Sequence, residues 1–234
     1  MSGKAGNMVK TQTVLTTAEA RAFYDRFGRK QDSQGFYENP ALDDLVASSR
    51  FREAQNAFEF GCGTGRFAAR LLEKELPASA TYLGCDLSAV MVALAEERLD
   101  AFAGRATVVQ SDGAIRFPLS DRSVDRVVSC YLLDLLSGAD IAAFLAGARR
   151  VLRPGGLLCL VSLTEGVSAW SRIVIALWMA LFRLRPSLVG GCRPIRLEAY
   201  PDTETWQVLH RRVVAPFGVP SEVPVATVKR APRD

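Results

Sequence analysis

The sequence predicts an α/β fold in which helices cover both faces of a doubly wound, mainly parallel sheet. From residue 57 onward, short apolar runs alternate with segments of helical period, the pattern of a parallel sheet covered by helices. A glycine-rich turn joins the first run to the first helical segment. The composition, 49% hydrophobic and 23% charged over 234 residues, is that of a chain that buries one core. We expect an N-terminal tail and helical lid over residues 1–56 and a single domain over residues 57–234.

The predicted core elements follow one another in a regular order. Five apolar runs of strand length are expected to form the parallel part of the sheet: Ala57–Gly61, Thr81–Cys85, Ala106–Gln110, Val124–Cys130 and Leu157–Leu163. Three segments of helical period lie between them: Gly65–Leu76, Ala89–Ala103 and Ala139–Leu152. The sequence Arg153-Pro154-Gly155-Gly156 predicts a tight turn into the fifth strand, because proline stops a helix and glycine accepts positive φ.

The flanking segments predict a lid before the core and a hairpin after it. Two short helices separated by a polar, turn-prone stretch, residues 28–40, are expected to lie against the core as a lid. Near the C-terminus, two strand-like runs flank a loop rich in proline and glycine, which predicts an antiparallel hairpin at the sheet edge. The segments are Thr17–Phe27 and Ala41–Arg50 for the lid, Ser168–Leu184 for a helix after the core, and Thr205–Val214 with Glu222–Lys229 for the hairpin.

Cysteine usage and charge narrow the class of protein. The five cysteines, Cys62, Cys85, Cys130, Cys159 and Cys192, are odd in number and form no CxxC pair, so we expect reduced core residues in a cytoplasmic protein. The polar N-terminus does not resemble a secretory signal. The longest uncharged apolar run, Ile173–Phe182, has ten residues and is too short to span a bilayer. Residues 166–234 carry ten Lys/Arg against five Asp/Glu, which indicates an anionic substrate, a membrane surface or a solvated basic face.

The strongest local signal is the run Gly61-Cys62-Gly63-Thr64-Gly65 between an apolar strand and a helix. Alternating glycines let the backbone turn sharply, adopt positive φ and approach a ligand closely. The helix that follows presents free N–H groups at the same point. A nucleotide-like ligand at the carboxyl ends of the strands is expected, although the motif also fits part of a dinucleotide fingerprint or a purely structural turn.

Acidic residues follow the next two predicted strands. Asp86 stands 21 residues after Gly65, where its carboxylate can accept hydrogen bonds from both hydroxyls of a ribose. The alternative is that Asp86 or Ser88 caps the helix that follows. Asp112 stands at the end of the third strand, where it can accept a hydrogen bond from the amino group of an adenine; the alternative is an Asp that forms a turn.

Four segments in order resemble a known family: EFGCGTGRFA (59–68), YLGCDLSAVMVALAEERL (82–99), SDGAIRFPLSDRSVDRVVSCYLLDLL (111–136) and RRVLRPGGLLCLVS (149–162). They are similar to the class I S-adenosylmethionine (SAM)-dependent methyltransferases of the ubiquinone/menaquinone-biosynthesis-like type. The resemblance covers about residues 57–163. It implies a Rossmann-like, seven-stranded sheet whose last strand is antiparallel, in agreement with the predicted hairpin.

The same resemblance implies SAM as the cofactor and assigns residues to it. The glycine turn would surround the methionine part, Asp86 would bind the ribose, and Asp112 with Gly113 would bind the adenine. An N-terminal tyrosine would cover the cofactor, and the end of the fourth strand would line the methyl donor. The implied cofactor-binding residues are Tyr24, Glu59, Gly61, Cys62, Gly63, Gly65, Asp86, Leu87, Asp112, Gly113, Ser129 and Cys130, with Tyr131 beside them.

Methyl transfer from SAM needs little from the protein beyond position. The methyl group is already electrophilic, so holding nucleophile, carbon and sulfur in line supplies on the order of 7–11 kcal/mol. A general base is optional and the sequence identifies none. The one histidine, His210, is a candidate base in the penultimate strand, with a structural or exposed histidine as the alternative. No pattern of metal ligands is visible, so no metal is expected.

The acceptor is constrained only by what surrounds the core motifs. The fourth strand ends in Ser-Cys-Tyr-Leu-Leu and not in the Asp/Asn-Pro-Pro-aromatic turn of enzymes that methylate exocyclic amines, so no nucleic-acid partner is expected. The apolar segment Trp170–Leu184 is interpreted as a wall for an apolar or amphiphilic small molecule, such as a quinone precursor, a lipid or a polyketide; a core helix or a dimer contact is the alternative. Its basic flank favours an anionic acceptor or peripheral membrane contact through Trp170–Arg185; the arginines are Arg172, Arg183, Arg185, Arg193 and Arg196. A methyltransferase acting on protein or RNA, and a noncatalytic SAM- or NAD-binding protein, are the competing functions.

Overall fold

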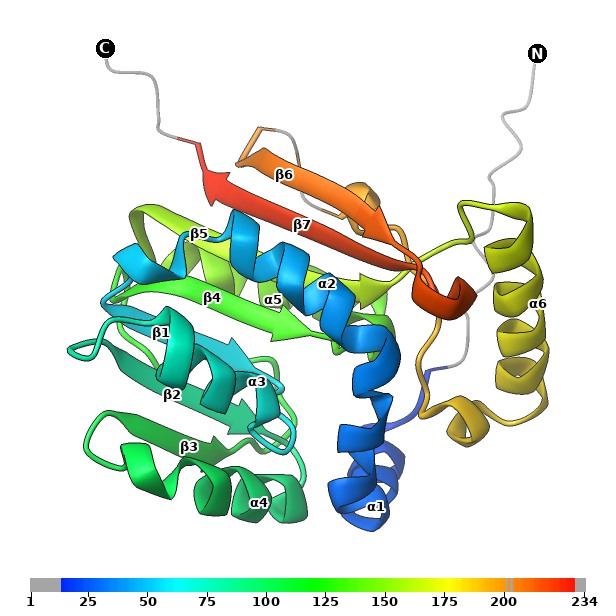
Figure 1. The fold of residues 1–234 in the computed structure, drawn as a ribbon, viewed down its shortest axis with the longest axis horizontal. Helices are drawn as coiled ribbons and strands as arrows, with labels where there is room; N and C mark the ends of the chain where they lie inside the picture. The colour runs from blue at the N-terminus through cyan, green and yellow to red at the C-terminus, as the bar shows by residue number, and fades with distance from the viewer. Residues whose placement is uncertain (1–13, 201, 203, 230–234) are drawn as a thin grey trace, which may run out of the picture.

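The computed structural model describes residues 14–200, 202 and 204–229, and its centre is a seven-stranded sheet in the order β3-β2-β1-β4-β5-β7-β6 (Figure 1). The pairs among β1 to β5 are parallel, whereas β7 is antiparallel to both of its neighbours, β5 and β6. This confirms the expected fold class, including the antiparallel last strand. The strands are β1 Asn56–Phe60, β2 Thr81–Asp86, β3 Ala106–Gln110, β4 Val124–Cys130, β5 Leu152–Leu163, β6 Trp206–Val214 and β7 Ser221–Val228.

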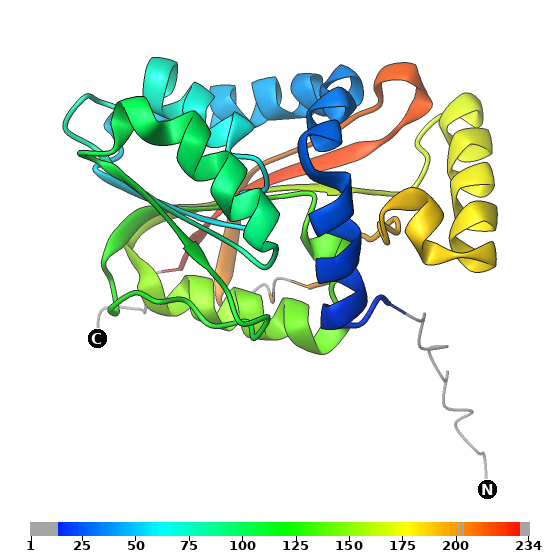
Figure 2. The same ribbon diagram turned by 90° about the horizontal axis from the view of Figure 1, so that it is seen from below.

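Helices lie on both faces of the sheet, and two more lie at its carboxyl end. Figure 2 shows α2, α3 and α4 on one face and α5 on the other. The lid helix α1 crosses in front of the strand ends, and α6 lies beyond the end of β5. The helices are α1 Thr17–Phe27, α2 Gly35–Ser48, α3 Arg66–Arg70, α4 Ala89–Leu99, α5 Gly138–Val151 and α6 Ala169–Leu184. In the part of the chain that the structure describes, no helix has the length and hydropathy needed to cross a bilayer.

Alternation along β5 explains why both faces need helices. Leu157 and Cys159 pack into the hydrophobic cluster under α2, α3 and α4, whereas Leu158 and Leu160 pack into the cluster under α5. All four side chains are at most 2% exposed. A strand buried on both sides is a continuous apolar run, and this is the pattern from which the sequence predicted it.

A third, smaller cluster fastens α6 to the end of the sheet. Ile175, Met179 and Phe182 of α6 pack against Leu163 at the end of β5 and against Tyr37 of α2. Ser168 caps the helix by accepting the N–H of Ser171 at 3.1 Å. One face of α6 is therefore part of the core, at the end of the sheet where the strands' carboxyl termini lie.

Two predicted boundaries were wrong. The polar stretch 28–40 is not a loop: it forms a 3-10 helix, Gly28–Gln34, and the start of α2 at Gly35, with Pro40 inside the helix. Burial of Tyr37 and the ion pair of Glu38 with Arg66 stabilise a helix that local propensity does not favour.

The second wrong boundary is the Arg-Pro-Gly-Gly turn, which lies inside β5 instead of before it. Leu152 pairs with Val124, and Leu157 pairs with Arg126, so the intervening residues bulge out of the ladder. Gly155 has a φ of 82°, which an L side chain adopts only with strain. The helix predicted over Gly65–Leu76 is α3 followed by a π-helical turn, Leu71–Glu75.

Candidate active site

The glycine turn between β1 and α3 leaves no room for side chains. Gly61, Gly63 and Gly65 have φ values of 82°, 54° and 73°. A Cβ at Gly63 would lie 2.6 Å from Oε1 of Gln31, and one at Gly61 would lie 3.0 Å from a methyl group of Leu132. Glycine is therefore required both by the backbone conformation and by the close approach of neighbouring groups.

Asp86 at the end of β2 holds the glycine turn in place. Its Oδ2 accepts the N–H of Gly63 and its Oδ1 accepts the N–H of Ser88, both at 2.9 Å. Burial raises the pKa of this carboxyl group, while the two backbone donors oppose the rise. Ser88, not Asp86, caps α4, because its Oγ accepts the N–H of Met91 at 3.1 Å. Each Asp86 oxygen keeps acceptor capacity for a further donor.

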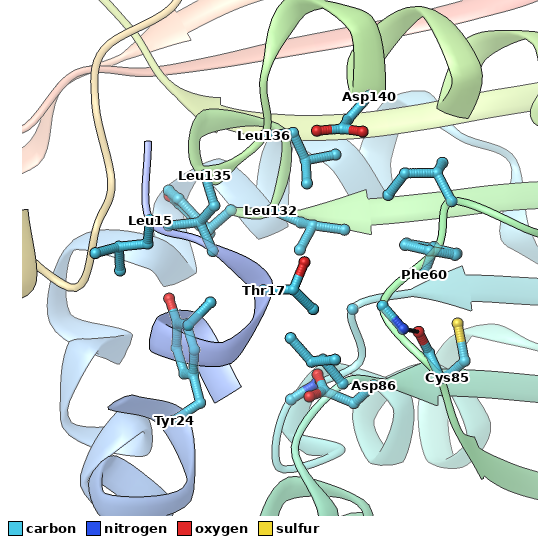
Figure 3. Close-up of a pocket in the computed structure, with 18 of the residues that line it drawn as sticks. Leu15, Thr17, Tyr24, Phe60, Cys85, Asp86, Leu132, Leu135, Leu136 and Asp140 are labelled. Atoms are coloured by element: carbon cyan, nitrogen blue, oxygen red, sulfur yellow. Dashed lines mark hydrogen bonds between the residues drawn. The ribbon is translucent and has the colours of Figure 1, made fainter. Parts of the chain in front are cut away.

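A pocket of about 170 Å³ opens at this end of the sheet, between the ends of β1 and β2, the lid and the segment after β4 (Figure 3). In the figure, Asp86 lies below the pocket, Leu132, Leu135 and Leu136 lie above it, and Tyr24 comes from the lid. Seven of the predicted cofactor residues line it: Tyr24, Gly61, Gly63, Asp86, Leu87, Gly113 and Cys130. The structure thus brings together residues from five separate segments of the chain.

A second, polar cavity adjoins the first and contains two further predicted residues, Glu59 and Cys62. Both cavities are lined by Gln31, Gly61, Gly63, Cys130 and Tyr131. Glu59 is 2% exposed and accepts the hydroxyl of Tyr82 at 2.6 Å. Burial raises its pKa to about 7, and the bond from Tyr82 opposes the rise. An apolar compartment and a polar one therefore meet at the glycine turn.

Gln31 is a site residue that the sequence analysis missed. It lies in the 3-10 helix that replaced the predicted loop, and it lines both cavities. Its Oε1 is buried and has no hydrogen-bond partner among the described residues. A buried acceptor without a donor is costly, so this oxygen suits a ligand that donates a hydrogen bond or carries positive charge. A lone glutamine in a polar stretch gives no sequence signal for such a role.

The lid is tied to the site by specific polar contacts. The Tyr24 hydroxyl donates to the carbonyl of Gly190 at 3.4 Å, and burial raises the pKa of this tyrosine well above its usual value. Asp25 accepts the Ser88 hydroxyl at 2.5 Å. Asp32 accepts the Thr64 hydroxyl at 2.6 Å and pairs with Arg98 at 2.5 Å. The lid therefore docks on the glycine turn and on the start of α4, as a covering element must.

Three predicted residues lie outside the two cavities. Asp112 has an exposed carboxylate that accepts the N–H of Ala114 at 2.9 Å and pairs with Arg116, so it acts as the turn former that the sequence also allowed. Ser129 is fully buried and donates to the carbonyl of Phe60 at 2.9 Å. Gly65 faces α4, where a Cβ would lie 3.0 Å from Ala95. The adenine role of Asp112 stays a prediction that requires its carboxylate to leave Arg116.

His210 is not near either cavity. Its Nε2 lies 2.7 Å from Oδ2 of Asp44, which joins β6 to α2 on the outside of the sheet. This geometry favours the structural alternative over a catalytic base. Across residues 14–200, 202 and 204–229, no group of three or more His, Cys, Asp or Glu side chains is arranged to hold a metal ion.

Comparisons with known proteins agree with this geometry. A family model described as a methyltransferase domain matches residues 57–156. A tRNA N(3)-methylcytidine methyltransferase of Drosophila melanogaster is 27% identical over 60% of this chain and 46% of its own length. A malonyl-[acyl-carrier protein] O-methyltransferase of a Marinomonas species is 32% identical over 61% of this chain and 51% of its own length. The chain thus spans about half the length of these relatives.

Solved structures show the same fold. The YcgJ protein of Bacillus subtilis aligns with a TM-score of 0.61 at 15% identity, over 83% of this chain and all of that one. The sheet order, the glycine turn with Asp86 behind it, and the match of residues 57–156 lead to one conclusion. Residues 57–156 are similar to a methyltransferase domain, and the fold around them is the seven-stranded, Rossmann-like sheet that the resemblance to class I SAM-dependent methyltransferases implied.

Proposed function

We propose that this protein transfers a methyl group from SAM to a small acceptor that is apolar or amphiphilic. The observation that supports the acceptor class is the composition of the pocket next to the glycine turn. Its wall facing the turn is built by leucines of the segment after β4 and by residues of the lid: Leu15, Leu132, Leu135, Leu136 and Tyr24. Apolar walls with few polar groups are typical of pockets for small organic molecules.

The residues around the glycine turn fit the parts of SAM. The two Asp86 oxygens suit the ribose hydroxyls, and the pocket surface at Leu87 and Gly113 suits a flat base. The orphaned Oε1 of Gln31 and the buried carboxyl of Glu59 suit the positively charged amino group of the methionine part. When bound, SAM supplies an electrophilic methyl group on a sulfonium.

The chain's own contribution is to orient the acceptor and exclude water. Leu132, with its neighbours after β4, contacts the glycine turn directly, so an acceptor on this wall would lie beside the cofactor. The raised pKa of Tyr24 keeps its hydroxyl protonated, which makes it a hydrogen-bond donor and not a base. Positioning of this kind supplies on the order of 7–11 kcal/mol without a general base.

A labelling experiment tests the proposal. The protein and methyl-labelled SAM are incubated together in three parallel reactions, which contain a lipid extract, RNA or whole-cell protein. We expect label in the organic extract, and we expect Asp86→Ala to lower transfer at limiting SAM because two ribose hydroxyls lose their acceptor, at a cost of about 1–3 kcal/mol. Asp121→Ala, an exposed carboxylate that pairs with Arg150 away from both cavities, is the matched control.

Other outcomes of this experiment are equally informative. Label in RNA, the substrate class in the name of the Drosophila relative, would replace the small-molecule proposal with RNA methylation. Absence of label in every fraction, together with SAM binding in a calorimeter, would favour a noncatalytic SAM-binding protein.

The free state of all five cysteines supports the expectation of a reducing, cytoplasmic setting.

A further inference from the structure

Helix α6 has a second apolar face that points to solvent. Ile175, Met179 and Phe182 pack on the core. A separate stripe on the same helix, spaced three or four residues apart, is exposed: Trp170 (61%), Ile173 (53%), Leu177 (64%), Leu181 (46%) and Leu184 (77%). This spacing places the stripe along one line of the helix. Isolated exposed apolar residues are common, but a continuous stripe on a helix marks an interaction surface.

The stripe continues onto the neighbouring loops. Leu188, in the turn after α6, is 54% exposed, and Phe217 in the loop between β6 and β7 is 73% exposed. Phe36 is 59% exposed, and its ring lies 5.6 Å from that of Phe217. Phe217 has a φ of 53°, a strained conformation for an aromatic residue, so the loop holds this ring outward at a cost. The stripe with Leu188, Phe36 and Phe217 is called the α6 patch below.

Along α6 and the turn after it, all charged side chains have one sign. Residues 169–189 contain Arg172, Arg183 and Arg185 and no Asp or Glu. The three arginines are exposed, and no ion pair among the described residues includes them. Elsewhere on the surface, arginines commonly have acidic partners, as Arg150 does in Asp121. The patch is therefore apolar in its centre and cationic at its ends.

We propose that the α6 patch docks the protein on an anionic lipid surface. A helix with a tryptophan and leucines on one face, with arginines beside them, is the form that lies in the plane of a membrane interface. Its 16 residues, about 24 Å long, are too few to span a bilayer, so it rests on the surface. Anionic headgroups supply the counter-charges that no described residue places beside these arginines.

A second copy of the chain fits this surface less well. In a two-fold dimer the same patch faces itself, so the arginines at the ends of one α6 would approach those of the other. Like charges brought together without acidic partners oppose association. A lipid surface avoids this conflict, because its headgroups carry the opposite charge.

Docking through the patch would turn the reactive end of the protein toward the lipid. Helix α6 and the lid both lie at the carboxyl end of the sheet (Figure 1). Trp178 of α6 donates to the carbonyl of Cys192 at 2.8 Å, and Tyr24 of the lid donates to the carbonyl of Gly190 in the same loop. The lid and helix α6, which carries the patch, are thus connected through one short loop. This docking surface goes beyond the proposed methyl transfer and does not depend on the acceptor.

Vesicle co-sedimentation tests the proposal with the whole chain. We expect the protein to bind phosphatidylcholine vesicles that contain phosphatidylglycerol, to bind pure phosphatidylcholine weakly, and to lose binding as salt rises. Because each arginine near an anionic surface contributes about a fivefold factor, Arg183→Gln with Arg185→Gln should weaken binding roughly 25-fold. Arg52→Gln with Arg149→Gln, exposed arginines outside the patch, is the matched control and should leave binding unchanged.

A second variant tests the apolar half of the surface. Leu177→Gln with Leu181→Gln should abolish binding to either vesicle, while thermal unfolding in solution stays near that of the unchanged protein because both side chains are exposed. Unchanged binding by the Arg183/Arg185 pair, or no binding of the original chain to anionic vesicles, would overturn the proposal. A concentration-dependent dimer that the leucine variant abolishes would also overturn it, since a second copy would then cover the patch.

Discussion

Single residues at the site show how a few polar atoms define a ligand. Gln31 is the clearest case, because its Oε1 is buried beside the glycine turn and has no donor among the described residues. We expect Gln31→Ala to weaken SAM binding by about 1–2 kcal/mol, through loss of an acceptor for the charged amino group. The same change should not lower the melting temperature of the protein without SAM, since no protein hydrogen bond is lost.

Titration calorimetry with SAM, and thermal unfolding without it, measure both effects. Gln34→Ala is the matched control, because Gln34 lies in the same 3-10 helix and lines neither cavity. If Gln31→Ala binds SAM as tightly as the unchanged protein does, the oxygen does not serve the cofactor. If it unfolds at a lower temperature instead, the side chain is structural.

Asp134 predicts a pH-dependent term in stability. It is fully buried after β4, and burial raises its pKa from 3.8 to about 7, while the N–H of Leu163 and the charge of Arg193 oppose the rise. Between these two values the unfolded chain releases the proton and the folded chain keeps it, so the free energy of unfolding falls as pH rises. Asp134→Asn removes this term, so its free energy of unfolding should rise relative to that of the unchanged protein by about 4 kcal/mol across that window.

Urea unfolding at a series of pH values checks this expectation. The difference in unfolding free energy between Asp134→Asn and the unchanged chain should grow from about pH 4 to about pH 7 and then level off. Asp121→Asn, at an exposed position, should show no such trend. A constant difference for Asp134→Asn would mean that the folded carboxyl titrates normally.

Among single residues, those that stand at a fixed distance from a recognisable motif could be predicted from the sequence. Asp86 was predicted from its place at a strand end, at a set distance from the glycines, and the structure places it in the pocket wall, where its ribose role stays a prediction. Asp112 has the same position after its strand, yet its carboxylate pairs with Arg116 outside the cavities. The direction of a side chain in a loop depends on nonlocal partners, and the sequence does not encode these locally.

At the scale of secondary-structure elements, the turn from β1 to α3 shows how backbone conformation shapes the site. Gly63 combines a φ of 54° with a position where a Cβ would lie 2.6 Å from Gln31. We expect Gly63→Ala to destabilise the fold by about 1–2 kcal/mol through the positive φ, and to weaken SAM binding further because the turn shifts away from Asp86.

A matched glycine elsewhere provides the control. Gly104 has no atom within 4 Å of the Cβ that alanine would add, and it is not among the glycines with positive φ. Gly104→Ala should change the free energy of unfolding by less than about 0.5 kcal/mol and leave SAM binding intact. Equal behaviour of the two variants in urea unfolding and in calorimetry would show that the turn tolerates a side chain.

Element positions were predictable wherever a local pattern agreed with the packing. The bounds of α1 and of β4 match the prediction, since a helical period or an apolar run coincides with the buried face. The start of α2 was not predictable, because Tyr37 and Glu38 owe their helix to the core and to Arg66. The bulge in β5 was missed because a Pro-Gly-Gly sequence is compatible both with a turn before a strand and with a bulge inside one.

On the scale of the whole molecule, the order of the strands determines where the site lies. β2 and β3 follow β1 on one side, and β4 begins the run on the other side, so the sheet reverses direction of growth between β1 and β4. Loops leave in opposite directions at such a point and open a crevice at the carboxyl ends. The alternation of elements predicted a doubly wound sheet, but the crevice walls come from distant segments that only the folded chain brings together.

The place of β7 has a consequence for how the chain is made. It is the last of the seven strands to be synthesised, yet it lies between β5 and β6 and pairs with both. Until Ser221–Val228 leaves the ribosome, β5 has an open hydrogen-bonding edge and β6 has no partner at all. Open edges of this kind recruit other strands. A polypeptide released before Ser221 would therefore expose a template for aggregation. Pairing of β7 with β5 and β6 removes this exposed edge at the end of synthesis.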